Sequence, residues 1–240
     1  MQTRSRRARA TSYSVLVCVL ALLLSSCALR DALAPDDEPV PTATPSAVEE
    51  LFDSQFTRDG TFQSHIDVDG LDFVYTLWPT KSTPRTNEWY PRGDKFFSFT
   101  FQAYDLDRRL RDPFATKRKV YLDRIAVTSR TTTLGDGPAQ RPYRLEASAR
   151  TITFDPEPVT TRHGMLITSP KGAFELRNQR IGSMSLDTRG LTLRFTATVW
   201  IQERAGGDSF VKKEIRQDVP IAIFESSEPT KATKIPINAN

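Results

Sequence analysis

The chain has 240 residues, 38% of them hydrophobic, and a formal charge of +4, because 33 basic residues exceed 29 acidic ones. Four arginines lie within the first nine positions, and the remaining 29 basic residues are matched by the 29 acidic ones. Beyond that first segment there is no surplus of positive charge for binding nucleic-acid phosphates, so we expect no nucleic-acid partner.

The N-terminus has the three parts of a secretory signal. The arginines precede an apolar run over residues 13–24, and small residues then lead to a cysteine in the sequence Leu24-Ser25-Ser26-Cys27. The apolar run is too short for a comfortable transmembrane helix. The layout therefore predicts export from the cytoplasm rather than a membrane span.

The ending Leu-Ser-Ser-Cys resembles the lipobox of bacterial lipoproteins. The resemblance implies that residues 1–26 are a lipoprotein signal peptide, cleaved before Cys27, and that Cys27 carries the lipid anchor. The alternative is an ordinary signal peptide followed by a chance cysteine. Cys18 falls in the segment that would be removed, so we expect no disulfide and a fold that depends on its core alone.

A tether is predicted over residues 27–46, which are rich in proline and acidic residues and poor in large apolar ones. Such a composition favours extended, polyproline-like chain. Ser46 and Glu49 have the spacing of a capping box, which predicts a short helix over residues 47–54. We expect a folded domain over residues 47–225 and a polar tail over 226–240.

Strand patterns dominate from residue 61 onward. Two runs, 62–68 and 71–78, flank Asp69-Gly70, a pair suited to a type I′ hairpin turn. Alternating phenylalanines mark a strand over 97–101, and a long apolar stripe of period two covers 191–201. Further strands are predicted over 120–130, 145–154, 210–215 and 220–224.

Long segments with a helical period of 3.6 residues are absent from the sequence. Several strands separated by turn signals, each with one apolar face, predict an all-β fold. We expect an antiparallel, immunoglobulin-like β-sandwich. The missing strand–helix alternation argues against a two-lobed α/β solute-binding protein.

The segment over residues 78–92 is predicted as a binding surface. Connections of this length are often functional. This one carries residue types that are enriched in binding hot spots, namely Trp78, Arg85, Trp89, Tyr90 and Arg92. The alternative is that its aromatic rings fold back and plug one end of the sandwich.

A second segment, over residues 108–119, is densely basic. It is either a solvated loop or a contact for anionic envelope components.

A copper site is a further hypothesis. His163 and Met165, joined by Met184 and His65, offer the imidazole and thioether ligands that suit reduced copper. The alternative is that the methionines fill gaps in the core and that His163 lies in a loop. A zinc site is disfavoured, because there is no closely spaced histidine pair and no thiol beyond Cys27.

The sequence thus predicts a lipoprotein of the cell envelope, anchored to the plasma or outer membrane. It contains no Gly-x-Ser-x-Gly elbow, and we expect neither an enzyme nor a cofactor. The expected function is a non-enzymatic binding or structural module for another envelope protein or a polysaccharide. The alternative is an exported carrier of copper or another small ligand that uses His163 and Met165.

Overall fold

The computed structural model describes residues 52, 54–81, 87–135 and 137–225. Several predicted features lie outside these residues, namely the predicted signal peptide (1–26), Cys27, the predicted tether (27–46), most of the predicted helix 47–54, Arg85 and the predicted tail (226–240). The described elements are α3 (Gln55–Asp59), β1 (Phe62–Val68), β2 (Leu71–Pro79), β3 (Lys95–Asp105), η1 (Phe114–Thr116), β4 (Val120–Thr133), β5 (Arg144–Ser148), α4 (Ala149–Ile152), β6 (Thr160–Thr161), β7 (Gly164–Leu166), β8 (Phe174–Ile181), β9 (Thr188–Gln202) and β10 (Phe210–Ala222). Among them, no helix has the length and apolar character needed to cross a bilayer.

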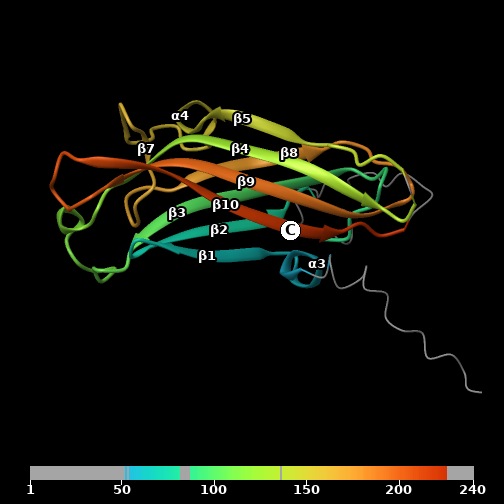
Figure 1. Ribbon diagram of the computed structural model, residues 1–240, viewed down its shortest axis with the longest axis horizontal. Helices are drawn as coiled ribbons and strands as arrows, with labels where there is room; N and C mark the ends of the chain where they lie inside the picture. Colours follow the sequence, from blue (N-terminus) through green and yellow to red (C-terminus); the bar gives the residue numbers. More distant parts are fainter. Residues whose placement is uncertain (1–51, 53, 82–86, 136, 226–240) are drawn as a thin grey trace, which may run out of the picture. The chain divides into compact units, whose positions relative to one another are not determined.

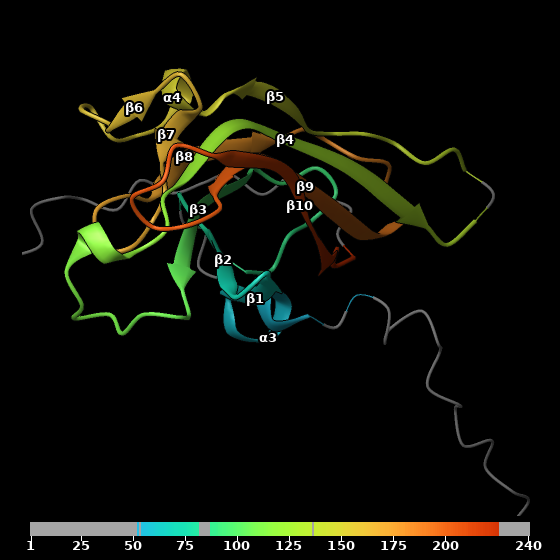
Figure 2. The ribbon, with the colours of Figure 1, turned by 60° about the vertical axis from the view of Figure 1, so that its left-hand side comes forward.

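The strands form two antiparallel sheets, which confirms the predicted all-β class (Figure 1). The first sheet has the order β1-β2-β3-β8, and the second has the order β10-β9-β4-β7-β6. Strand β4 pairs with β9 along one side. Its other side is shared by β5 and β7, which gather with α4 and β6 in one region (Figure 2).

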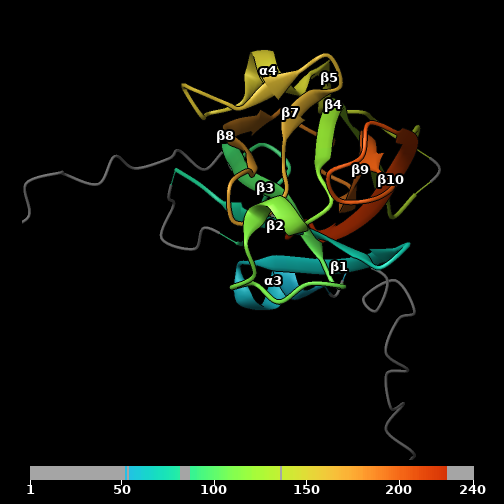
Figure 3. The ribbon, with the colours of Figure 1, turned by 90° about the vertical axis from the view of Figure 1, so that its left-hand side faces the viewer.

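The core lies between the two sheets and includes both of the predicted apolar stripes. Phe97, Phe99 and Phe101 of β3 are fully buried, as are the inward residues of β9. The ring of Phe195 on β9 meets Phe99 at 5.0 Å and Tyr75 at 5.6 Å between centroids, so the sheets pack on each other directly. Figure 3 looks nearly along the strands and shows β1, β2 and β3 on one side and β4, β9 and β10 on the other.

The predicted hairpin turn between β1 and β2 is confirmed. Asp69 and Gly70 have φ values of 54° and 72°, and positive φ at both central residues defines a type I′ turn. The Gly70 N–H donates to Asp67 Oδ1 at 3.2 Å. The strands leave this turn in the register that pairs Val68 with Leu71.

Two predicted strand boundaries were wrong. The strand predicted over 145–154 ends at Ser148 and is followed by α4. In antiparallel register Ser148 pairs with Arg124, and β7 occupies the same edge of β4 at Tyr121 and Leu122, so β5 has no room to continue. The strands predicted over 210–215 and 220–224 are one strand, β10, because β9 offers an unbroken partner from Gly190 to Gln202.

Strand β10 is the edge of the second sheet and pairs only with β9 among the described strands. Its outward side alternates charges of both signs, and it contains Pro220. Proline is tolerated at an edge because its missing N–H removes no interior hydrogen bond, and charges discourage pairing with a second molecule. The edge is therefore protected against aggregation.

Candidate functional site

The predicted binding segment 78–92 contributes Trp89 to the core. The indole of Trp89 is 3% exposed and packs edge-on against Phe56, with ring centroids 4.9 Å apart. Its carbonyl oxygen accepts a hydrogen bond from the Phe224 N–H at 2.8 Å. Trp89 therefore stabilises the fold, and its ring has little surface left for a ligand.

The other predicted residues of this segment are more accessible. Trp78 and Tyr90 are half-buried, and Arg92 is exposed. The Tyr90 hydroxyl donates to Glu88 Oε2 at 2.9 Å, while Arg85 lies outside the described residues. Binding by this segment stays a prediction, and it rests on these less buried side chains.

Lys95 fastens the end of the same segment, a role that sequence reasoning missed. Its ammonium group is buried and donates to the backbone carbonyls of Tyr90, Pro91 and Gly93 at 2.9, 3.0 and 2.6 Å. Burial lowers the pKa of Lys95 to about 8, against the opposing influence of the Asp94 carboxylate. The lysine thus acts as an internal clamp on the turn that precedes β3.

The residues of the copper hypothesis have separate surroundings. Met165 and Met184 belong to the buried core, whereas the His163 ring stacks on Phe210 at 4.4 Å and lies 4.9 Å from Trp200. His65 pairs with Asp72 on the other sheet, at 2.7 Å. Within the described ranges, no three His, Cys, Asp or Glu side chains form a group that could hold a metal ion. The copper site stays a prediction without a supporting contact.

The basic segment 108–119 divides into two halves. Lys117, Arg118 and Lys119 are built into the fold, since Arg118 donates to the carbonyls of Asp69 and Gly70 and to the Asp105 carboxylate. The segment begins with residues 108–111, which are exposed. Within this charged run, Arg118 therefore has a structural role, since it joins the β1–β2 hairpin turn to the chain just before β4.

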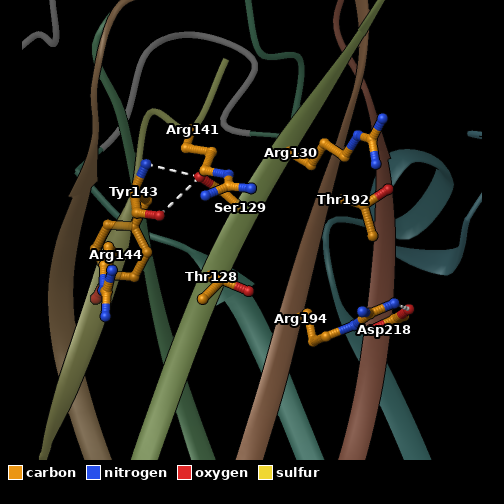
Figure 4. A pocket seen from close by; sticks show the side chains of 9 residues that line it. All are labelled: Thr128, Ser129, Arg130, Arg141, Tyr143, Arg144, Thr192, Arg194 and Asp218. Atoms are coloured by element: carbon orange, nitrogen blue, oxygen red, sulfur yellow. Dashed lines mark hydrogen bonds and ion pairs between the residues drawn. The ribbon is translucent and has the colours of Figure 1, made fainter. Parts of the chain in front are cut away.

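A groove lies on the outer face of the second sheet, and we call it the arginine groove (Figure 4). It measures about 620 Å³. Its lining crosses the sheet from the segment before β5, over β4 and β9, to β10. The lining residues are Thr128, Ser129, Arg130, Arg141, Tyr143, Arg144, Thr192, Arg194 and Asp218.

Strand register explains why these side chains meet. Outward positions of neighbouring strands align in rows, because side chains alternate between the two faces of a sheet. One row runs from Arg144 through Thr128 and Arg194 to Asp218, and the next places Arg130 opposite Thr192. In Figure 4 Arg141 and Arg144 lie on one side of the groove, Arg130 and Arg194 on the other, and Thr128 between them.

The wall of the groove before β5 is held rigidly. The buried Ser129 hydroxyl donates to the carbonyl of Tyr143 and accepts from its N–H, both at 2.7 Å. The Tyr143 ring packs edge-on against Phe97 at 5.2 Å, and its hydroxyl donates to Gln179 Oε1. Burial raises the pKa of Tyr143, so the phenol stays neutral. The groove is thus anchored to the core from below.

The four guanidinium groups differ in their partners. Arg194 makes a two-point ion pair with Asp218, at 2.8 and 2.7 Å, and this hydrogen-bonded pairing lowers the pKa of the Asp218 carboxyl. Arg144 reaches Glu146 at 3.3 Å. The guanidinium groups of Arg130 and Arg141 have neither a hydrogen bond nor an ion pair in the described part of the chain. Two strong donors therefore face solvent at the mouth of the groove.

Four aromatic rings cluster farther along the same face of the second sheet. Tyr121, His163, Trp200 and Phe210 are all half-buried. The centroids of the rings that contact one another lie 4.4–6.3 Å apart. Lys212 stands over the Trp200 ring at 5.4 Å. We call these residues the aromatic cluster. Sequence reasoning missed both surfaces, because most of their exposed residues are typical of ordinary outward strand positions and lie on different strands.

The arginine groove and the aromatic cluster are preformed on adjacent strands of one sheet. Guanidinium groups and hydroxyls at the first suit an oxyanion, and ring faces at the second suit a flat apolar surface. Neither a family model nor a curated protein matches this chain.

Proposed function

We propose that this protein is a lipid-anchored lipoprotein of the bacterial cell envelope that acts as a non-enzymatic binding or structural module for an envelope protein or a polysaccharide. The lipobox-like sequence before Cys27 and the proline-rich stretch after it support the anchor and the tether. Acyl chains on Cys27, inserted in the plasma or outer membrane, would keep the folded domain beside the bilayer.

The observation that carries the binding role is the arginine groove. Arg130, Arg144 and Arg194 stand on paired strands, and the segment that carries Arg141 is fastened to β4 by the hydrogen bonds between Ser129 and Tyr143. The backbone positions of the donors are therefore fixed before any ligand arrives. The carboxylate of Asp218, which lines it, is engaged by Arg194. Positioned donors of this kind fix and orient a ligand, which is the task of a binding surface.

We also propose that the two sheets form an immunoglobulin-like sandwich. An immunoglobulin domain sets strands A, B and E of one sheet against strands G, F and C of the other. The orders β2-β3-β8 and β10-β9-β4 follow the same path, with β1 added outside β2. A crystal structure in which β8 paired with β4 rather than with β3 would contradict this assignment.

Cell fractionation and intact mass test the anchor. We expect the protein in the membrane fraction, with a mass that corresponds to a diacylated or triacylated chain beginning at Cys27. The Cys27→Ser variant should lose the lipid and leave the membrane. A native protein that is free of lipid, or that is found in the medium, would refute the proposal.

Site-directed crosslinking tests the binding surface. Because the thiol of Cys27 is expected to carry lipid, a cysteine introduced at Thr192 would be the reactive one, and Thr192→Cys should crosslink to an envelope component in native membranes. Arg92→Cys reports on the predicted segment 78–92, and Gln63→Cys, exposed on β1, is the control. Crosslinks from Arg92→Cys but not from Thr192→Cys would move the binding surface to segment 78–92. No crosslink above the control at either position would reject the binding role.

A further inference from the structure

Positive charge is concentrated in the arginine groove, although the chain beyond its first nine residues is balanced. The lining contains four arginines and one carboxylate, Asp218, which Arg194 already neutralises. Arg144 shares Glu146 with Arg124. Two arginines therefore share one carboxylate there. In addition, the guanidinium groups of Arg130 and Arg141 have no described partner, so both of their charges are uncompensated.

The chemistry of this lining selects an oxyanion. A guanidinium group offers planar, paired N–H donors that match a carboxylate or phosphate, and it is more weakly hydrated than an ammonium group. The hydroxyls of Thr128 and Thr192 stand between the arginines. Hydroxyl side chains give and take hydrogen bonds, so the groove suits a ligand that carries its own hydroxyls beside its anionic groups.

The same face continues toward the aromatic cluster. Arg194 and Trp200 both point outward from β9, six residues apart, which at the rise of a β-strand is roughly 20 Å. The outward residues of β9 between them are Thr196 and Thr198. A ligand in contact with both ends must be elongated, anionic at one end and in contact with ring faces at the other.

We propose that the arginine groove, extended by the aromatic cluster, binds an acidic polysaccharide. Carboxylates of the polymer pair with Arg130 and Arg141, its hydroxyls bond to the threonines, and its sugar rings stack on Trp200. This inference rests on the proposed binding function and names its ligand. An acidic protein segment fits less well, because peptide side chains supply few hydroxyls and no sugar ring for Trp200.

Equilibrium binding to the full lipidated chain in detergent micelles tests this. The probe is an octamer of galacturonic acid, with a neutral glucose octamer and octaglutamate as comparisons. We expect binding of the galacturonate octamer that weakens as salt rises, because exposed charges are screened, and at least tenfold weaker binding of both comparisons.

The decisive variant is Arg130→Gln combined with Arg141→Gln. Since these guanidinium groups have no described partner, the variant should keep the wild-type melting temperature and bind the galacturonate octamer at least tenfold more weakly. Arg150→Gln with Arg204→Gln is the matched control, because both arginines are exposed away from the groove, and it should bind within twofold of the wild type. Arg130→Lys with Arg141→Lys should give an intermediate loss, since lysine keeps the charge but not the paired donors.

A length series tests the extension to the aromatic cluster. Trp200→Leu should weaken binding of the galacturonate octamer but not of the trimer, which is too short to reach both ends. Equal affinity of the wild type for trimer and octamer would remove the aromatic cluster from the site.

Other results would overturn the proposal. If the galacturonate octamer does not bind, or binds the Arg130→Gln, Arg141→Gln variant as well as the wild type, the groove is not its site. If octaglutamate binds as tightly as the galacturonate octamer, the groove serves an acidic protein segment. The proposed function can still hold in these cases, because the lipid on Cys27 and the crosslink from Thr192→Cys would still be observed. The polysaccharide proposal can therefore fail without the proposed function failing.

Discussion

Tyr75 is a buried residue with an uncompensated polar atom. Its side chain is 2% exposed and stacks on Phe101 at 4.2 Å, but its hydroxyl has no hydrogen-bond partner within the described structure. Burial raises the pKa of this phenol, so it stays protonated. A buried hydroxyl without a partner costs free energy that its ring must offset.

Removing that hydroxyl should stabilise the protein. We expect Tyr75→Phe to raise the free energy of unfolding by about 1 kcal/mol, because the cost of an unpaired group disappears. Tyr143→Phe is the comparison, since its hydroxyl bonds to Gln179, and it should lower that free energy by about 1 kcal/mol. Urea denaturation measures both. A destabilised Tyr75→Phe variant would show that the hydroxyl has a partner in solution.

Lys95 makes stability depend on pH in the alkaline range. Its pKa is about 8 in the folded protein against 10.5 in the unfolded chain, because burial disfavours the ammonium form. Between these values the unfolded chain binds more protons, so the free energy of unfolding should rise with pH, by at most about 1.4 kcal/mol per pH unit. Urea denaturation at several pH values from 7 to 11 should show this rise in the wild type and not in Lys95→Met. A rise of equal slope in both proteins would contradict the assignment.

At the scale of elements, strands with strong alternation were predictable and the short ones were not. Local sequence pattern is enough to predict β3 and β9 from their alternating apolar residues, and the hairpin turn from Asp69-Gly70. The end of β5 depends on β7 occupying the same edge of β4, which is a contact between distant segments. A single sequence carries no signal for such competition between strands.

The arginine groove was unpredictable for the same reason. Arg130 and Arg194 lie on different strands, and only the strand register brings them to one face, while Arg141 comes from the segment before β5. Each alone is typical of a solvated strand position. By contrast, Trp89 and Tyr90 attracted attention through their type, although type alone does not tell a core residue from a binding one.

The Phe52 ring packs directly against the backbone of Gly190 on β9, where the glycine has no side chain. A methyl group at residue 190 would lie 2.1 Å from the Phe52 ring, far inside van der Waals contact. We expect Gly190→Ala to displace the ring and to lower the free energy of unfolding by about 1–3 kcal/mol. Urea denaturation measures this.

The double variant provides the control. Adding Phe52→Ala to Gly190→Ala should cost little beyond the larger single effect, because both changes break one contact. Strictly additive losses would show that the glycine has another role.

For the whole domain, Arg118 is the tie between the sheets. Its side chain donates hydrogen bonds to the carbonyls of Asp69 and Gly70 in the hairpin of the first sheet and to Asp105 at the end of β3. It lies two residues before the start of β4 in the second sheet. Burial by itself would raise the pKa of Asp105, but hydrogen bonds from the Arg118 side chain and backbone outweigh it and lower that pKa.

This tie should make the fold sensitive to acid. The stabilisation from Asp105 is fully present above the ordinary carboxyl pKa of about 3.8 and is lost as pH falls through the lower value in the folded protein. Asp105→Asn should lower the free energy of unfolding at pH 7 by about 3 kcal/mol, because it removes the buried charge partner of a mostly buried guanidinium group and leaves it only the exposed Asp107. It should also flatten the decline of that free energy below pH 4. Denaturation from pH 2 to 7 measures both, and an unchanged acid profile would contradict this role.

The enclosed amine of Lys95 has a practical consequence. Acylating reagents modify neutral, accessible amines, and this amine is covered by the turn from Tyr90 to Gly93 whose carbonyls hold it. Its rate of modification, followed by peptide mass spectrometry beside that of exposed lysines, would report how often this turn opens. The acylation rate of Lys95 is therefore a measure of how often the backbone opens at the end of segment 78–92.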